Sequence, residues 1–105
     1  VSGRASEEET LATISAVRAA STELLCPHSA VGVKVAQEIR DPDVPMITLA
    51  TAHPAKFPDA VEQASGIRPG LPARMADLFD REERVTRVEN DLASLQALVR
   101  KERAA

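Results

Sequence analysis

Residues 45–52, with the sequence PMITLATA, constrain the fold of this chain more than any other segment. The run is short, nearly all apolar and contains β-branched residues, and a turn sequence at residues 41–43 precedes it. Such a run is typical of a β-strand that is buried on both faces, as in the parallel sheet of an α/β protein. A strand of this kind is stable only beside other strands, so the fold depends on where those strands come from.

Residues 83–89 have the second strand-like pattern, because Val85 and Val88 stand among charged residues as they would in a short edge strand. Two strands are too few for a self-sufficient parallel sheet. We therefore expect sheet partners from the remainder of a larger protein. The chain opens on Val1 without a methionine, which agrees with a segment that is truncated at its N-terminus.

Helical patterns fill most of the remaining sequence. Ser6 and Glu9 have the spacing of a capping box, which predicts a helix that ends near Ala20. Residues 29–40 favour a second helix, although their alternating valines would also suit a strand. Gly32 lies inside this helix, where glycine is unfavourable, and it can instead mark a close approach to another segment. The order of elements, α-α-β-α-α-β-α, then includes three more helices, at residues 58–64, at residues 73–80 and after Asn90, which we expect to cap the last helix.

The core of this chain must be aliphatic, because its 105 residues include two phenylalanines and neither tryptophan nor tyrosine. We expect Ile14 to lie on the buried face of the first helix and Phe79 to be buried by the short helix around it. Leu92 and Leu95 are expected on the buried face of the last helix. Together these patterns predict a helix-rich α/β segment with two short strands, which spans residues 1–105 as a single piece.

Charge and composition exclude several kinds of protein. Thirteen lysines and arginines oppose sixteen aspartates and glutamates, which gives a net charge of −3 without the basic patch of a nucleic-acid-binding protein. The longest apolar stretches are far shorter than the about 20 residues that a membrane-spanning helix needs. Cys26 is a single cysteine and cannot form an internal disulfide, so we expect a protein of the reducing cytoplasm.

Residues 51–57 (TAHPAKF) are the first candidate for a functional site. Thr51, His53 and Lys56 place a hydroxyl, an imidazole and an ammonium group directly after the predicted strand. In open α/β sheets, ligands bind just outside the carboxyl ends of the strands, which is the place of this segment. The spacing of the three side chains matches no metal-binding or nucleophile motif, and an ordinary loop between a strand and a helix remains the alternative.

Residues 26–30 (CPHSA) are the second candidate. Cys26 and His28 lack the further ligands that a structural zinc site requires. A polar helix N-terminus, at which backbone N–H groups, the Ser29 hydroxyl and His28 face a ligand, is the better functional interpretation. Alternatively, Ser29 is a simple N-cap and Cys26 is a small buried apolar residue.

These segments, in this order, resemble the C-terminal part of threonine synthase over most of the chain. The resemblance lies in residues 6–11 (SEEETL), residues 27–32 (PHSAVG) and residues 49–57 (LATAHPAKF), of which residues 51–57 are the most distinctive. It implies a fold type II enzyme, in which pyridoxal 5′-phosphate (PLP) is bound in a larger open α/β fold. The implied activity is that of a lyase of amino-acid biosynthesis, which converts O-phospho-homoserine and water into threonine and phosphate.

The resemblance also implies that the chain is the C-terminal portion of the catalytic, PLP-binding region, with the remainder of the enzyme and the substrate O-phospho-homoserine as its partners. Lys34, Lys56 and Lys101 do not match the motif of the lysine that forms the Schiff base with PLP. We therefore expect the chain alone to bind PLP weakly or not at all and to be inactive. The alternatives are a freestanding α/β interaction or regulatory module without catalysis, and a purely structural fragment.

For the site, the resemblance implies cofactor-binding residues and no catalytic or metal-binding residue. Thr51 matches the serine or threonine that hydrogen-bonds the pyridine nitrogen of PLP, and a hydroxyl there leaves that nitrogen largely unprotonated. His28 and Ser29 correspond to a helix start that borders the cofactor pocket. His53 and Lys56 belong to the family signature, and the resemblance assigns no catalytic step to either residue.

Overall fold

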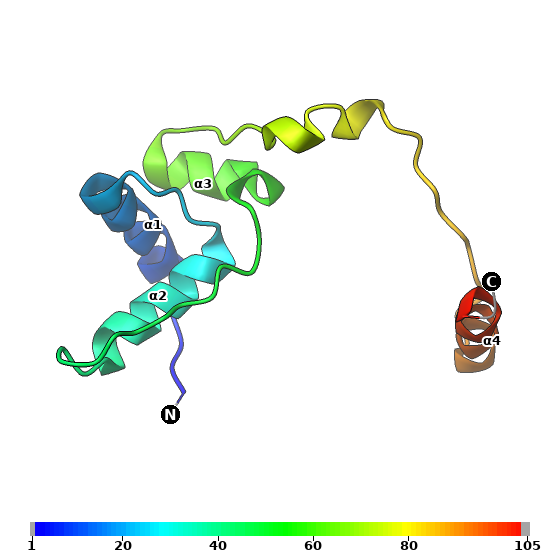
Figure 1. Cartoon of the computed structure of the whole chain (residues 1–105), viewed down its shortest axis with the longest axis horizontal. Helices are drawn as coiled ribbons and strands as arrows, with labels where there is room; N and C mark the ends of the chain where they lie inside the picture. The colour runs from blue at the N-terminus through cyan, green and yellow to red at the C-terminus, as the bar shows by residue number, and fades with distance from the viewer. Residues whose placement is uncertain (1, 104–105) are drawn as a thin grey trace. The chain divides into compact units, whose positions relative to one another are not determined.

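The computed structural model describes residues 2–103, which divide after Arg74 into two compact units, residues 2–74 and residues 75–103. The elements of the first unit, in chain order, are α1 (Glu7–Ser21), α2 (Pro27–Ile39), the 3₁₀ helix η1 (Pro54–Lys56), α3 (Pro58–Ser65) and η2 (Ala73–Met75), which reaches the boundary between the units. The second unit contains η3 (Leu78–Asp80) and α4 (Leu92–Arg103). In the first unit, α1 packs against both α2 and α3 (Figure 1). No helix among the described residues is long and apolar enough to cross a membrane.

The structure contradicts the expected α/β fold with two short strands, because residues 2–103 contain neither a strand nor a sheet. Residues 45–52 instead run along α2 as an unpaired segment (Figure 1), and residues 83–89 are unpaired and exposed as well. A strand requires backbone hydrogen bonds to a neighbouring segment, and no described segment supplies them. The apolar run is not buried on both faces either, since Ile47 is 84% exposed and Leu49 is 76% exposed.

The start of α1 confirms the predicted capping box. The Ser6 hydroxyl accepts a hydrogen bond from the backbone N–H of Glu9 at 3.1 Å, and a Glu9 carboxylate oxygen accepts one from the backbone N–H of Ser6 at 2.7 Å. Two backbone donors that would otherwise lack a partner at the helix start are thereby satisfied. The helix ends at Thr22, whose φ of 64° is left-handed and whose N–H reaches the Arg18 carbonyl at 3.1 Å.

The second predicted helix is also present, but it begins two residues earlier than the sequence indicates. Pro27 is its first residue, and the preceding Cys26 is the N-cap, with its Sγ accepting a hydrogen bond from the backbone N–H of Ser29 at 3.4 Å. Proline suits the first helical position because its fixed φ is already helical and its missing N–H is not needed there. Ser29 is therefore not the N-cap, because it lies inside the first turn.

The core of the first unit is small and aliphatic, as the composition predicts. Its fully buried side chains include Ile14 from α1 and Val61 from α3, with Ala30 of α2 beside the buried Cys26. Thr10 and Thr13 of α1 are buried too, and their hydroxyls donate to the backbone carbonyls of Ser6 and Glu9, both at 2.7 Å. These bonds satisfy hydroxyl groups that would otherwise cost free energy to bury.

The second unit buries fewer of its apolar side chains than the sequence predicts. The helix expected at residues 73–80 is replaced by the short 3₁₀ helices η2 and η3, and Phe79 is 84% exposed instead of buried. The apolar residues Leu92 and Leu95 of α4 are exposed as well. Asp91, and not Asn90, caps α4, because its carboxylate accepts a hydrogen bond from the backbone N–H of Ser94 at 2.9 Å. Periodic apolar spacing in the sequence identifies the helix but not what covers it.

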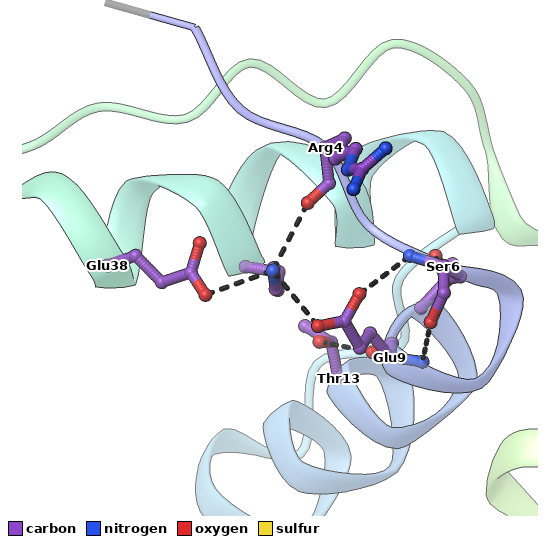
Figure 2. A network of polar contacts seen from close by, with 7 residues as sticks. Arg4, Ser6, Glu9, Thr13 and Glu38 are labelled. Atoms are coloured by element: carbon purple, nitrogen blue, oxygen red, sulfur yellow. Dashed lines mark hydrogen bonds and ion pairs between the residues drawn. The ribbon is translucent and has the colours of Figure 1, made fainter.

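An ion-pair network around Lys34 joins α1 to α2 (Figure 2). The Lys34 ammonium lies 3.2 Å from the Glu9 carboxylate on α1 and 2.9 Å from the Glu38 carboxylate on α2, and it donates to the Arg4 carbonyl at 3.1 Å. The hydrogen bonds to Glu38 and Glu9 raise the pKa of Lys34. The backbone hydrogen bond from Ser6, followed by the bond to Lys34, lowers the pKa of Glu9. One carboxylate thus caps α1 and also pairs with α2.

Truncation of the buried core should destabilise the fold much more than the same truncation at an exposed site. Ile14→Ala leaves a cavity at a fully buried position and should lower the free energy of unfolding by about 2–5 kcal/mol. Ile39→Ala, at the half-exposed end of α2, should cost less than about 1 kcal/mol. Urea unfolding followed by far-ultraviolet circular dichroism measures both values. Equal losses would contradict the assignment of Ile14 to the core.

The pH dependence of stability should depend on Glu9. Because its pKa is lowered by folding, Glu9 stabilises the protein above the usual glutamate pKa of about 4.3, and this contribution is lost as the pH falls through the lowered value. Glu9→Gln keeps a side chain that can cap the helix but removes the charge, so it should weaken the loss of stability in acid. Thermal unfolding at neutral pH and below pH about 4 tests this. An unchanged pH profile in the variant would refute the role of Glu9.

Candidate functional site

The two segments singled out from the sequence lie beside each other at the start of α2. His28 is the second residue of α2, and Phe57 follows η1. Their ring centroids are 4.7 Å apart and the ring planes are tilted by 46°. This spacing is that of a favourable aromatic pair, so the fold brings residues 26–30 and residues 51–57 together although they are distant in sequence.

Residues 53–57 form a short, internally supported turn. The His53 side chain caps η1, because its Nδ1 accepts a hydrogen bond from the backbone N–H of Ala55 at 3.1 Å. Pro54 begins η1 and Pro58 begins α3, so two fixed φ angles restrict the segment further. The Lys56 ammonium lies 5.9 Å from the centre of the Phe57 ring, within the range of a cation–π contact. His53 and Lys56 therefore both support the turn that follows Thr51.

Thr51 lies at the entrance to this turn, two residues before the capping His53. Its side chain is exposed, as is that of His28. A hydroxyl group both donates and accepts hydrogen bonds, so an exposed threonine can pair with a ring nitrogen or with an oxygen of a ligand. Of the three site residues predicted from the sequence, Thr51 and His28 thus have exposed side chains.

Ser29, the third predicted site residue, is placed differently. Its side chain is only 4% exposed, and its hydroxyl lies 3.2 Å from the Sγ of Cys26, which is buried as well. These contacts hold the first turn of α2 together from the inside. Cys26 is therefore a small buried residue with a capping role, which matches the simpler interpretation of this cysteine.

A groove beside His28 was not apparent from the sequence. It has a volume of about 350 Å³, and its walls include His28 and Val31 of α2, Leu11 of α1 and Ala60 of α3. Because three helices that are separate in sequence form these walls, no local motif identifies the groove. Among the described residues, no group of three or more His, Cys, Asp or Glu side chains could hold a metal ion.

Comparisons with known proteins agree on one family. The family model "Threonine synthase, C-terminal" matches residues 29–99. The threonine synthase of Pseudomonas aeruginosa is 56% identical over 96 residues, which cover 90% of this chain and 20% of that protein. The threonine synthase of Corynebacterium glutamicum is 36% identical over 99 residues, which cover 93% of this chain and 21% of that protein.

Among solved structures, the crystal structure of PLP-bound threonine synthase from Brucella melitensis is similar, with a TM-score of 0.78 and 50% sequence identity. The similarity covers 98% of this chain and 22% of that chain, so the chain spans about a fifth of the length of the relatives it matches. These findings confirm the resemblance seen in the sequence motifs. Since the matching family model covers more than half of the chain, the chain belongs to the threonine synthase family and corresponds to its C-terminal region.

Proposed function

We propose that the chain is the C-terminal portion of a PLP-dependent threonine synthase, a lyase that converts O-phospho-homoserine and water into threonine and phosphate. The observation that carries this proposal is the 50% identity, over 98% of the chain, to a PLP-bound threonine synthase. The partners of the chain in this proposal are the remainder of the enzyme and the substrate O-phospho-homoserine. We place the enzyme in the cytoplasm, where the single thiol of Cys26, buried in the first unit, stays reduced.

Thr51 is the residue that we propose to bind the cofactor, by a hydrogen bond from its hydroxyl to the pyridine nitrogen. The side chain fits this role because it is exposed and because a hydroxyl can donate to an aromatic nitrogen. PLP, when bound, supplies an electron sink for the reaction. A carboxylate partner would favour a protonated ring nitrogen, whereas the Thr51 hydroxyl leaves it largely neutral and moderates that sink.

We propose that His28 and Ser29 line one side of the cofactor pocket, each in a different way. The exposed His28 ring presents its surface outward, next to the Phe57 ring. The buried Ser29 hydroxyl contacts Cys26 and thereby supports the helix start from which His28 projects. In this proposal, Ser29 shapes the pocket wall from behind it.

Lys34, Lys56 and Lys101 do not match the Schiff-base motif, and the surroundings of Lys34 also disfavour a Schiff base. A Schiff base forms from an unprotonated lysine amine. The Lys34 ammonium instead lies between the Glu9 and Glu38 carboxylates, which raise its pKa and so keep it protonated. We infer that the Schiff-base lysine and the groups that bind the phosphates lie in the remainder of the enzyme, and that this chain alone is inactive.

Removal of the Thr51 hydroxyl should change the cofactor in the full-length enzyme. Thr51→Val keeps the shape of the side chain and should lower kcat/KM roughly 10–100-fold, the effect expected for a lost hydrogen bond of this kind. It should also shift the absorbance spectrum of bound PLP. Thr51→Ser, which restores a hydroxyl, is the matched control and should recover both properties. Unchanged turnover and spectrum in Thr51→Val would refute the assignment.

The chain alone should not form a stable Schiff base with PLP. When the chain is mixed with PLP and reduced with borohydride, mass spectrometry should find only scattered, substoichiometric modification of exposed lysines. A stoichiometric adduct on one lysine would show that the chain contains its own cofactor-binding lysine. That result would favour a freestanding module over a portion of a larger enzyme.

A further inference from the structure

One face of α2 contacts the segment that contains Thr51 at two points. His28 and Gly32 are four residues apart on α2, so they lie on the same face, separated by about 6 Å along the helix axis. Phe57 contacts His28. Thr48 approaches Gly32. Thr51 lies between Thr48 and Phe57 in sequence, so the segment contacts α2 on both sides of Thr51, at two positions about one helical turn apart.

The contact at Gly32 depends on the absence of a side chain. A Cβ atom added to Gly32 would lie 3.0 Å from the Cγ2 methyl of Thr48, closer than ordinary van der Waals contact allows. Thr48 is partly buried, whereas its neighbours Ile47 and Leu49 are largely exposed. The segment therefore faces α2 through the Thr48 methyl, and Gly32 admits it. This close approach also accounts for a glycine in the interior of α2, where it is intrinsically unfavourable.

The contact at His28 holds the other end of the segment. The His28 and Phe57 rings are 4.7 Å apart, and the turn between Thr51 and Phe57 is stiffened by the cap that His53 gives to η1. A movement of Phe57 is thereby transmitted through a short, restricted turn to Thr51. The two contacts together limit how far the Thr51 hydroxyl can move relative to α2.

We propose that Gly32 and His28 are positioning residues for the Thr51 hydroxyl, because they hold the segment on both sides of it against one face of α2. This inference rests on the proposed role of Thr51 at the pyridine nitrogen. A hydrogen bond tolerates only a few tenths of an ångström of displacement, so a small shift of the segment weakens it. The absence of a side chain at Gly32 thus affects cofactor binding, although Gly32 does not touch the cofactor.

The experiment adds a side chain at Gly32 in the full-length enzyme. Gly32→Ala removes a glycine from a helix interior and should, by helix propensity, favour α2, but its Cβ should displace Thr48. Gly32→Val should displace it further. Gly70→Ala and Gly70→Val are the matched controls, because a Cβ at Gly70 meets no atom within 4 Å.

Three measurements report the displacement of Thr48 and its segment. Amide hydrogen exchange of residues 46–57 in the cofactor-free protein should become faster in the Gly32 variants. The affinity for PLP should fall, by about tenfold in Gly32→Val, and the absorbance of the bound cofactor should shift toward that of Thr51→Val. Thr48→Ser removes the methyl that the new Cβ contacts, so Gly32→Ala combined with Thr48→Ser should recover the exchange rate, affinity and spectrum of the parent enzyme.

A second pair of variants tests the contact at His28. His28→Ala removes the aromatic contact with Phe57 and should, like the Gly32 variants, speed amide exchange, weaken PLP binding and shift the cofactor spectrum. His28→Phe keeps a ring at this position and should largely avoid these changes. Recovery by an apolar ring would show that the contact with Phe57, and not the imidazole nitrogens, positions the Thr51 segment.

The outcomes separate this inference from the proposed function. If Thr51→Val changes the cofactor spectrum but the Gly32 variants behave like the Gly70 variants, the positioning role is wrong and the role of Thr51 stands. A double variant that fails to recover would likewise overturn the positioning role. If Thr51→Val leaves the spectrum unchanged, the proposed function fails and this inference falls with it.

Discussion

The packing of α2 against α1 is the constraint on which the first unit depends. Glu9 caps α1 and pairs with Lys34 of α2, so the same carboxylate takes part in the start of one helix and in the contact with the next. Once α2 is placed, its start carries His28 outward and its Gly32 face receives the segment that leads to Thr51. The helix packing therefore supports the candidate site, in which His28 projects from a helix and Thr51 lies on the unpaired segment beside it.

Features with local causes could be predicted from the sequence. The capping box at Ser6 needs only residues three apart, and a close approach to another segment was one interpretation open for the glycine in α2. Whether residues 45–52 form a strand could not be predicted from local sequence, because an apolar run does not specify its hydrogen-bonding partner. The exposed Phe79 has the same cause, since burial depends on what covers a residue and not on its own type.

The candidate site, too, was predictable only where its features have local causes. The motif that includes Thr51 and His28 could be recognised from residue order, and it identified the family that the comparisons then established. The contact between His28 and Phe57 could not be predicted, because it joins segments that only the fold brings together. The burial of Ser29 was also hidden, since it follows from Cys26, rather than Ser29, being the helix cap.

We propose above all that the Thr51 hydroxyl, held against α2, is the partner of the cofactor's ring nitrogen. Nitrogen-15 NMR of the full-length enzyme loaded with PLP labelled at the pyridine nitrogen measures the state of that atom directly. We expect a neutral, hydrogen-bonded ring nitrogen in the parent enzyme and a clear change in its chemical shift in Thr51→Val. A protonated ring nitrogen, or the same chemical shift in both proteins, would contradict this proposal.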